Sequence, residues 1–273
     1  MKSSLAATIS AVFILVLFHS EAIAHGSNKN VNLHVNPKWS ECSFQLDPAL
    51  TQQAWHEFTE EAGLVAYFRS MKNAKPIGVG NYELSIHQWE TAFDDTRSAW
   101  NDTFVHPDST HWLKEGDRLG FPGFTFRTGI TDEIDVDVYW AKNPNANYGF
   151  YGGQVQYAFY NNVLSHWTAS ARINFMSLYG PADLDLTIYG IDLLASKEYT
   201  VYSDWIFISP YAGVSTYLSA SHEKTVAVSL ADEKIVGVRG LIGAVANISM
   251  ARLAVEYNIA AVNSLSFKIG VEF

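Results

Sequence analysis

Apolar and polar residues alternate through the last ten positions of the sequence. The apolar positions are Leu265, Phe267, Ile269, Val271 and Phe273, and the residues between them are small or polar. Successive side chains of a β-strand point to opposite faces, so this pattern predicts a strand with one apolar and one polar face. The same alternation recurs at 132–140, 165–178 and 249–260.

Six further segments have a strand-like composition with weaker alternation: 79–90, 119–130, 148–160, 183–195, 204–218 and 233–247. Together with the four clear segments they predict about ten strands, within a range of about eight to twelve. Most connections on one side of this series are tight, whereas the other side holds the two longest, 91–118 and 219–233. Bacterial barrels have short periplasmic turns and longer outer loops, so the first strand is expected to rise from the periplasm.

The fold class follows from what a membrane permits. No segment of the mature chain approaches the roughly 18 consecutive apolar residues of a transmembrane helix. A chain without such a helix crosses lipid only as a closed barrel, because an open sheet edge leaves backbone groups unsatisfied. Charged residues are 17% of the chain, against about 25% in a typical soluble domain, and this deficit suits a lipid-facing exterior. We therefore predict an all-β protein, a closed antiparallel transmembrane β-barrel with an N-terminal amphipathic helix.

The N-terminal third lacks the strand alternation of the rest of the chain. Residues 1–24 have the charge, apolar stretch and small-residue site of a signal peptide, with an uncleaved membrane anchor as the alternative. Asp47 and Pro48 predict the start of a helix over 48–72. Its apolar stripe is Trp55, Phe58, Ala62, Val65 and Phe68, and its basic end holds Arg69, Lys72 and Lys75. The predicted division is 25–78 for lead-in and helix and 79–273 for the barrel. The helix either packs under or partly inside the barrel, or acts as a movable plug or docking site.

The C-terminal pattern resembles the signature of Gram-negative outer-membrane β-barrel proteins. This resemblance implies that the barrel-assembly machinery recognises Leu265, Phe267, Ile269, Val271 and Phe273, and that the barrel is surrounded by outer-membrane lipid. The segment 126–136 resembles the periplasmic hairpin of porin-like barrels of proteobacteria, including those linked to uptake of aromatic compounds. The resemblance covers about 79–273 and implies an architecture without naming a solute.

Charged residues on the polar faces are the candidate lumen lining. They are Arg127, Arg172, Arg252, Asp135, Asp137 and Glu256. The acidic run Asp132, Glu133, Asp135 and Asp137, with Asp183 and Asp185, raises a calcium site as an alternative. Alternate residues of a strand lie nearly ~7 Å apart, so pairing with Arg127, Arg172, Arg239, Arg252 and Lys268 is the favoured interpretation. We predict no metal site.

Three groups of residues resemble catalytic or metal-binding arrangements. Asp94 and Asp95 with His106 and His111 suit a rim protease but do not match the omptin motif order. Ser165 and His166 are adjacent, which on a strand sends them to opposite faces and prevents a dyad. Cleavage after residue 24 would leave His25 as an N-terminal copper ligand, without any matching fold downstream. We predict no catalytic residue, no cofactor and no enzyme.

Charge and cysteine content narrow the partners further. The net charge of −10 argues against nucleic acid. Cys42 is the single cysteine, so the fold holds without an internal disulfide.

Three functions remain open, and the third, an outer-membrane enzyme, lacks a credible set of catalytic residues. A ten-strand barrel lies near the size that its own side chains fill, so the first is a porin-like narrow channel for small solutes. The second is a structural or adhesive surface barrel acting through loops 91–118 and 219–233, where Trp100, Phe104 and Trp112 stand among polar residues.

Overall fold

The computed structural model describes residues 46–92, 94, 97–104, 118–142, 148–202 and 205–273. All of them belong to one compact unit. The predicted signal peptide and the lead-in 25–45 lie outside the described residues, as do Asp95, His106, His111 and Trp112.

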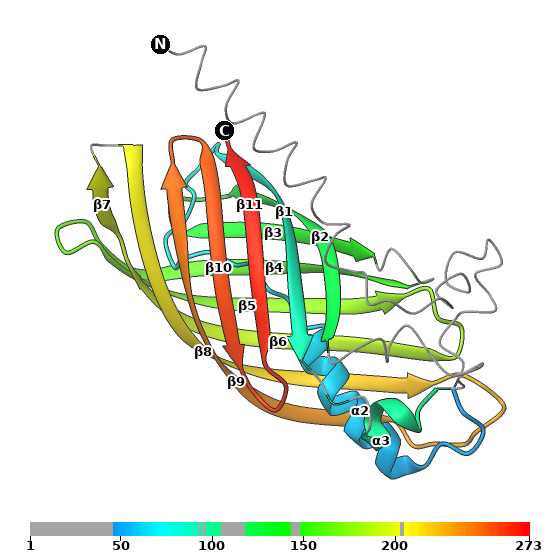
Figure 1. Cartoon of the computed structure of the whole chain (residues 1–273). Coiled ribbons are helices and arrows are strands. Elements are labelled where there is room, and N and C mark those ends of the chain that lie inside the picture. Colours follow the sequence, from blue (N-terminus) through cyan, green and yellow to red (C-terminus); the bar gives the residue numbers. More distant parts are fainter. Residues whose placement is uncertain (1–45, 93, 95–96, 105–117, 143–147, 203–204) are drawn as a thin grey trace, which may run out of the picture. The chain divides into compact units, whose positions relative to one another are not determined.

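Eleven strands form one antiparallel sheet (Figure 1). They are β1 (Tyr82–Ala92), β2 (Arg118–Gly129), β3 (Ile134–Lys142), β4 (Gly149–Asn162), β5 (Trp167–Tyr179), β6 (Leu184–Lys197), β7 (Tyr199–Tyr202), β8 (Ile206–Glu223), β9 (Glu233–Ile248), β10 (Ala251–Ile259) and β11 (Ser264–Glu272). The first strand pairs with the last, and β6 pairs with β8, so ten strands close into a barrel. The short β7 extends the edge of β8 outside this ring. The predicted closed ten-strand barrel is confirmed.

The two ends of the barrel differ. At one end, here called the turn end, lie the connections 130–133, 163–166 and 249–250 and the segment with β7; the backbone N–H of Tyr82 donates to the carbonyl of Phe273 there. The opposite loop end holds the connections 93–117, 143–148, 180–183, 224–232 and 260–263. One predicted loop bound was wrong, because β8 continues to Glu223 and shortens the loop 219–233. The connection between β6 and β8 contains the short strand β7.

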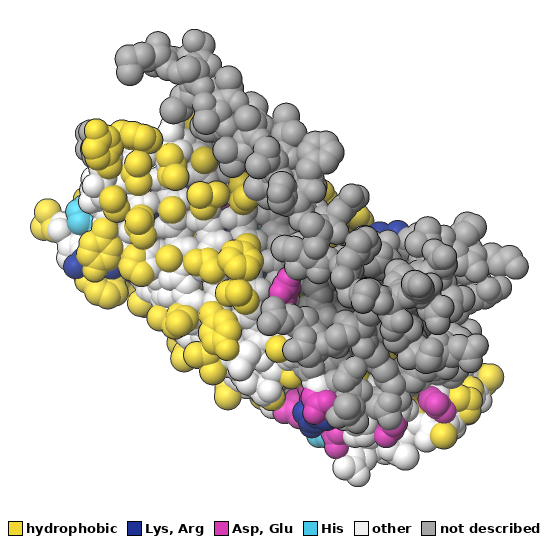
Figure 2. Space-filling view, viewed as in Figure 1, with side chains coloured by type: hydrophobic (Ala, Val, Ile, Leu, Met, Phe, Trp, Pro, Cys, Tyr) yellow, Lys and Arg dark blue, Asp and Glu magenta, His cyan; other side chains and the backbone are white. Residues whose placement is uncertain are grey.

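The barrel is apolar outside and polar inside. Along β5, Ile173 faces outward and is 60% exposed, while its neighbour Arg172 faces inward and is 2% exposed. The outward positions of β11 are Leu265, Phe267, Ile269 and Val271, which confirms the two predicted faces of that strand. Figure 2 shows hydrophobic side chains spread over the visible strand surface, with charged side chains toward the ends. A closed ring with this polarity is a membrane-spanning outer-membrane-type β-barrel.

The helix α2 (Gln52–Val65) is shorter than predicted at both ends. Asp47 and Pro48 form a turn instead, and the hydroxyl of Thr51 caps the helix by accepting the N–H of Ala54 in its first turn. The helix ends at Val65, where the Arg69 guanidinium donates to the carbonyls of Leu64 and Val65. Of the three basic residues predicted at the helix end, Arg69 alone bonds to the terminal carbonyls, and it does so from outside the helix. No helix among the described residues is long and apolar enough to cross a membrane.

The helix α2 packs into the loop end of the barrel. Its stripe of Trp55, Phe58, Ala62, Val65 and the following Phe68 is buried. Gly63 lets it approach the wall, since a Cβ there would lie 2.6 Å from the inward-facing Ser219 of β8. The helix is thus partly inside the barrel, as one of the two interpretations held.

A short helix, α3 (Ser98–Asn101), covers α2 from the 93–117 connection. Trp100 and Phe104 pack edge-on against Phe58, with ring centroids 5.5 and 5.1 Å away. Both are fully buried, so the expectation that they form a recognition surface was wrong. Burial of these two side chains against α2 stabilises its position, because removing apolar surface from water favours the packed state.

Placing a charge on the outward face tests the polarity of the barrel. In lipid vesicles, Ile173→Arg is expected to lower the free energy of unfolding by about 2–4 kcal/mol, the range for an arginine near the bilayer midplane. Val163→Arg at the turn end is the matched control and is expected to cost about 0–1 kcal/mol. Urea unfolding followed by tryptophan fluorescence measures both, and equal costs would contradict the assignment of a lipid-facing belt.

Candidate functional site: a lumen crossed by the N-terminal chain

Residues 66–78, here called the crossing segment, follow α2 and run through the barrel from the loop end to the turn end. The hydroxyl of Tyr67 donates to Asp192 of β6 at 2.7 Å. Further along, the N–H of Ala74 donates to Ser196, near the turn end of β6. The N–H of Ile77 then donates to Asp135, and β1 begins four residues after Gly78. The segment therefore spans the lumen in a single pass.

The wall supplies the hydrogen bonds that an extended segment does not make within itself. The guanidinium of Arg172 donates to the carbonyls of Lys72 and Asn73, at 2.6 and 3.2 Å. Gln156 donates to Ala74, and Arg127 donates to Lys75. Buried backbone carbonyls without a partner cost free energy, so these side chains make the segment's irregular path tolerable.

Buried ion pairs link the crossing segment to the wall near the turn end. The ammonium of Lys72 lies 2.5 Å from Asp137 and 3.8 Å from Asp135. Arg127 lies 2.5 Å from Asp135 and 3.3 Å from Glu83, which also accepts from Lys268 at 2.8 Å.

Three cations and three carboxylates thus form one network in which every side chain is less than a tenth exposed. Such a group is stable only when its members are paired, because an isolated buried charge is strongly unfavourable.

A second cluster of polar side chains holds the start of the crossing segment, next to α2. The guanidinium of Arg239 lies over the ring of Tyr67, 3.6 Å from its centroid, and 3.7 Å from Asp192. Gly190 makes room for this ring, since a Cβ there would lie 2.0 Å from the Tyr67 hydroxyl oxygen. The wall is therefore shaped for this residue.

At the loop end, charges of α2 are satisfied by the 93–117 connection. Glu61 accepts from the indole N–H of Trp100 at 2.5 Å and pairs with Arg97. Burial raises the pKa of Glu61 above its ordinary value, against the pull of these two donors. Glu57 accepts from the Ser98 hydroxyl, which lowers the pKa of Glu57.

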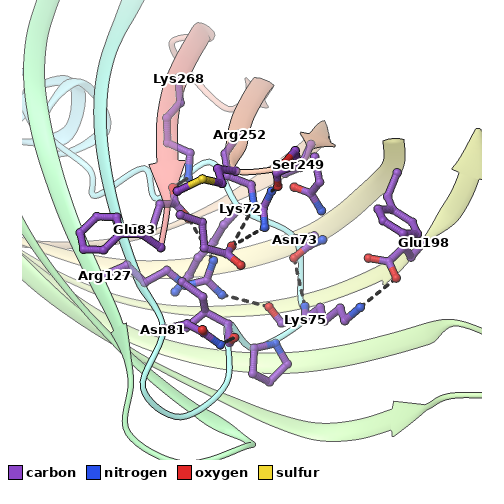
Figure 3. Close-up of a pocket in the computed structure, with 18 of the residues that line it drawn as sticks. Lys72, Asn73, Lys75, Asn81, Glu83, Arg127, Glu198, Ser249, Arg252 and Lys268 are labelled. Carbon is purple, nitrogen blue, oxygen red and sulfur yellow. Dashed lines mark hydrogen bonds and ion pairs between the residues drawn. The ribbon is translucent and has the colours of Figure 1, made fainter. Parts of the chain in front are cut away.

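The turn end is hollow where the loop end is packed. A cavity of about 560 Å³ lies between the crossing segment and strands β8 to β11. In Figure 3, Glu198 with its partner Lys75 lies across this cavity from Glu83 and Arg127. Arg252 lines it as well, paired with Glu272 at 2.7 Å. The cavity is therefore lined by paired charges and amides together with apolar side chains such as Trp205 and Phe207.

The structure places all six predicted lumen residues toward the barrel interior. It brings Arg127, Asp135 and Asp137 together in the ion-pair network, whereas Arg172 binds the backbone of the crossing segment. Glu256 lies elsewhere and accepts from the hydroxyl of Tyr211, and Arg252 lies at the rim of the cavity. That these residues line a solute path stays a prediction.

Sequence reasoning missed Lys72, Glu83 and Asp192 as site residues. Glu83 carried a signal, because it lies on the polar face of the first strand. Lys72 carried none, because it was assigned to the end of a helix that stops seven residues earlier.

The acidic run does not gather around a metal in the part of the chain that is described. Asp135 and Asp137 are held by Lys72 and Arg127, and Asp185 pairs with Lys224. Among the described residues there is no group of three potential metal ligands. Ser165 and His166 lie in the turn after β4 rather than on a strand, and His166 has a left-handed backbone with φ 57°.

The sequence matches no protein-family model and no curated protein. Solved structures with similar folds include LpxR from Salmonella typhimurium, with 10% identity, 69% of this chain and 99% of that chain covered, and a TM-score of 0.35. The beta domain of the Bordetella autotransporter BrkA shares 11% identity over 72% and 99% of the two chains, with a TM-score of 0.37. Neisserial surface protein A shares 13% over 71% and 96%, with a TM-score of 0.30. At these scores the likeness carries no argument about function, and the assignment as an outer-membrane barrel rests on its own closure and polarity.

Removing one member of the ion-pair network tests how firmly the crossing segment is held. Lys72→Met removes the nearest cation of Asp137, which then has only Arg127, at 4.0 Å, and is expected to cost about 3–5 kcal/mol of unfolding free energy. The control is Lys75→Met in the same segment, whose half-exposed lysine pairs with Glu198 and is worth about 0–1 kcal/mol.

The double variant Lys72→Met with Asp137→Asn removes both charges and is expected to recover part of the loss. Urea unfolding in vesicles measures all three. Equal costs for the two lysines would show that the network does not hold the segment.

Proposed function

We propose that the protein is a closed surface barrel, which spans the outer membrane and acts through its loop end rather than through its lumen. The observation that carries this proposal is the crossing segment, which occupies the lumen and bonds to the wall along its whole length. A conducting barrel would need this segment to leave, together with α2.

The energetic cost of displacing the segment supports a permanently closed state. Moving α2 out of the barrel exposes Trp55 and Phe58, whose burial stabilises the packed state by about 1.5–3 kcal/mol for a side chain of this size. It also separates Lys72 from Asp137 inside the wall.

Short turns face the periplasm in bacterial barrels, so the loop end faces the outside of the cell. The exposed groups there include Val226, His222 and Asp232 of the β8–β9 hairpin. The β8–β9 hairpin keeps a role in the surface function, because, unlike Trp100 and Phe104, it is exposed. That the protein is not an enzyme stays a prediction.

A gated narrow channel is the second candidate, and the turn-end cavity of about 560 Å³ is the observation that favours it. The cavity is open space at the turn end, so displacement of the crossing segment together with α2 would extend it through the barrel. In that case Arg127 and Lys268 of the wall would line the path, and solutes carrying a carboxylate would be its natural cargo.

Conductance in planar bilayers separates the two candidates. The hydroxyls of Thr59 on α2 and Ser221 on β8 lie 2.6 Å apart, so Thr59→Cys with Ser221→Cys, in a Cys42→Ser background, is expected to form a disulfide that fixes the helix to the wall. A closed surface barrel is expected to be silent, whether this pair is oxidised or reduced. Steady conductance of the wild type and of the reduced double-cysteine variant, abolished when the pair is oxidised, would instead establish the gated channel.

Deletion of residues 52–77 is the positive control for this measurement. It removes α2 and most of the crossing segment and is expected to produce ion conductance of nanosiemens order or below, since a ten-strand lumen is narrow. Migration of the unheated protein on a gel shows that the deleted form is still a barrel. A folded deletion variant that stays silent would show that the N-terminal chain is not what closes the lumen.

A further inference from the structure

The described chain begins at the loop end of the barrel. Leu46 forms a β-bridge with Phe104, and the N–H of Asp47 donates to the carbonyl of Thr103 at 3.0 Å. The N–H of Leu46 also donates to the carboxylate of Asp183, in the connection between β5 and β6. These partners belong to two different loop-end connections, so the position of Leu46 is fixed from two sides.

From this point the chain passes through the lumen once. It enters through α2, continues through the crossing segment, and reaches Tyr82 beside Phe273 at the turn end. Leu46 and Tyr82 therefore lie at opposite ends of the barrel. The two ends of the described chain, Leu46 and Phe273, lie at opposite ends as well.

We propose that residues 46–51, through which the chain enters the barrel, are displayed on the outside of the cell. The carboxyl end and the turns stay on the periplasmic side. This inference shares with the proposed function the orientation of the barrel, but it does not depend on a permanently closed lumen. The cell surface would then include residues 46–51 in addition to the predicted loops 91–118 and 219–233.

The entering chain is also part of one surface with the β8–β9 hairpin. The side-chain amide of Gln52 donates to the carbonyl of Ala231 at 3.1 Å and its oxygen accepts from the N–H of the same residue at 2.9 Å. His56 bonds to Glu233 at 2.8 Å. Pro48 and Ala49 are exposed beside these contacts. A partner that binds the hairpin would therefore meet the entering chain as well.

The hydrophobic core of the loop end keeps this arrangement from reversing. Bringing Leu46 to the turn end would require drawing Trp55 and Phe58 past Tyr67 and the ion pairs of Lys72. The chain therefore holds its direction once the barrel is folded.

Thiol labelling on intact cells tests the display. Three single-cysteine variants are made in a Cys42→Ser background: Ala49→Cys in the entering chain, Val226→Cys as the loop-end reference, and Leu164→Cys as the turn-end reference. All three positions are exposed, and Val226 and Leu164 are almost fully so. A membrane-impermeant maleimide is added before and after permeabilisation of the outer membrane.

The expected result is that A49C and V226C react on intact cells to within about twofold of each other, whereas L164C reacts only after permeabilisation. Labelling of V226C without A49C on intact cells would overturn the display and leave the orientation and the closed lumen standing. Labelling of L164C alone on intact cells would overturn the display and the orientation together. Migration on unheated gels confirms that each variant is folded.

Discussion

Closure of the hydrogen-bonded ring is the constraint on which the rest of this structure depends. Lipid offers no partner to a backbone N–H or carbonyl, so β1 must pair with β11 and β6 with β8 before the strands can exist in a membrane. Closure then decides the polarity, because each strand has one face toward lipid and one toward the interior. The low charge content and the alternation of the strands are consequences of this single requirement.

Closure also buries charged side chains inside the barrel, and the N-terminal chain supplies partners for them. Arg127, Asp135, Asp137 and Glu83 all face an interior from which bulk water is largely excluded. Lys72 contributes the additional cation that balances the network, and the wall returns hydrogen bonds from Arg172 and Gln156 to the segment that carries it. The barrel and the crossing segment therefore stabilise each other, and neither has a satisfied set of polar groups alone.

The sequence predicted the barrel closely because strand alternation is a local property. Each of the ten predicted strands exists, and their order and the division between tight and long connections follow directly. The helix bounds were wrong because the proline at 48 fits a turn as well as a helix start, and because Arg69 terminates α2 from beyond its end. The crossing segment could not be predicted, since an extended chain bonded to a wall has no periodicity. Trp100 and Phe104 were misplaced for a related reason: their burial depends on α2, which is distant in sequence.

The single pass of residues 46–78 has a consequence for biogenesis. A ring of strands that surrounds its own chain is a topological enclosure, and a bulky helix cannot be inserted into it sideways after β1 and β11 have joined. Either residues 46–78 already lie among the strands when β1 pairs with β11, or they pass through the closed barrel from the periplasm before α2 packs. In both cases the last step of maturation involves the entering chain and β11 together, although Leu46 and Phe273 lie at opposite ends of the barrel.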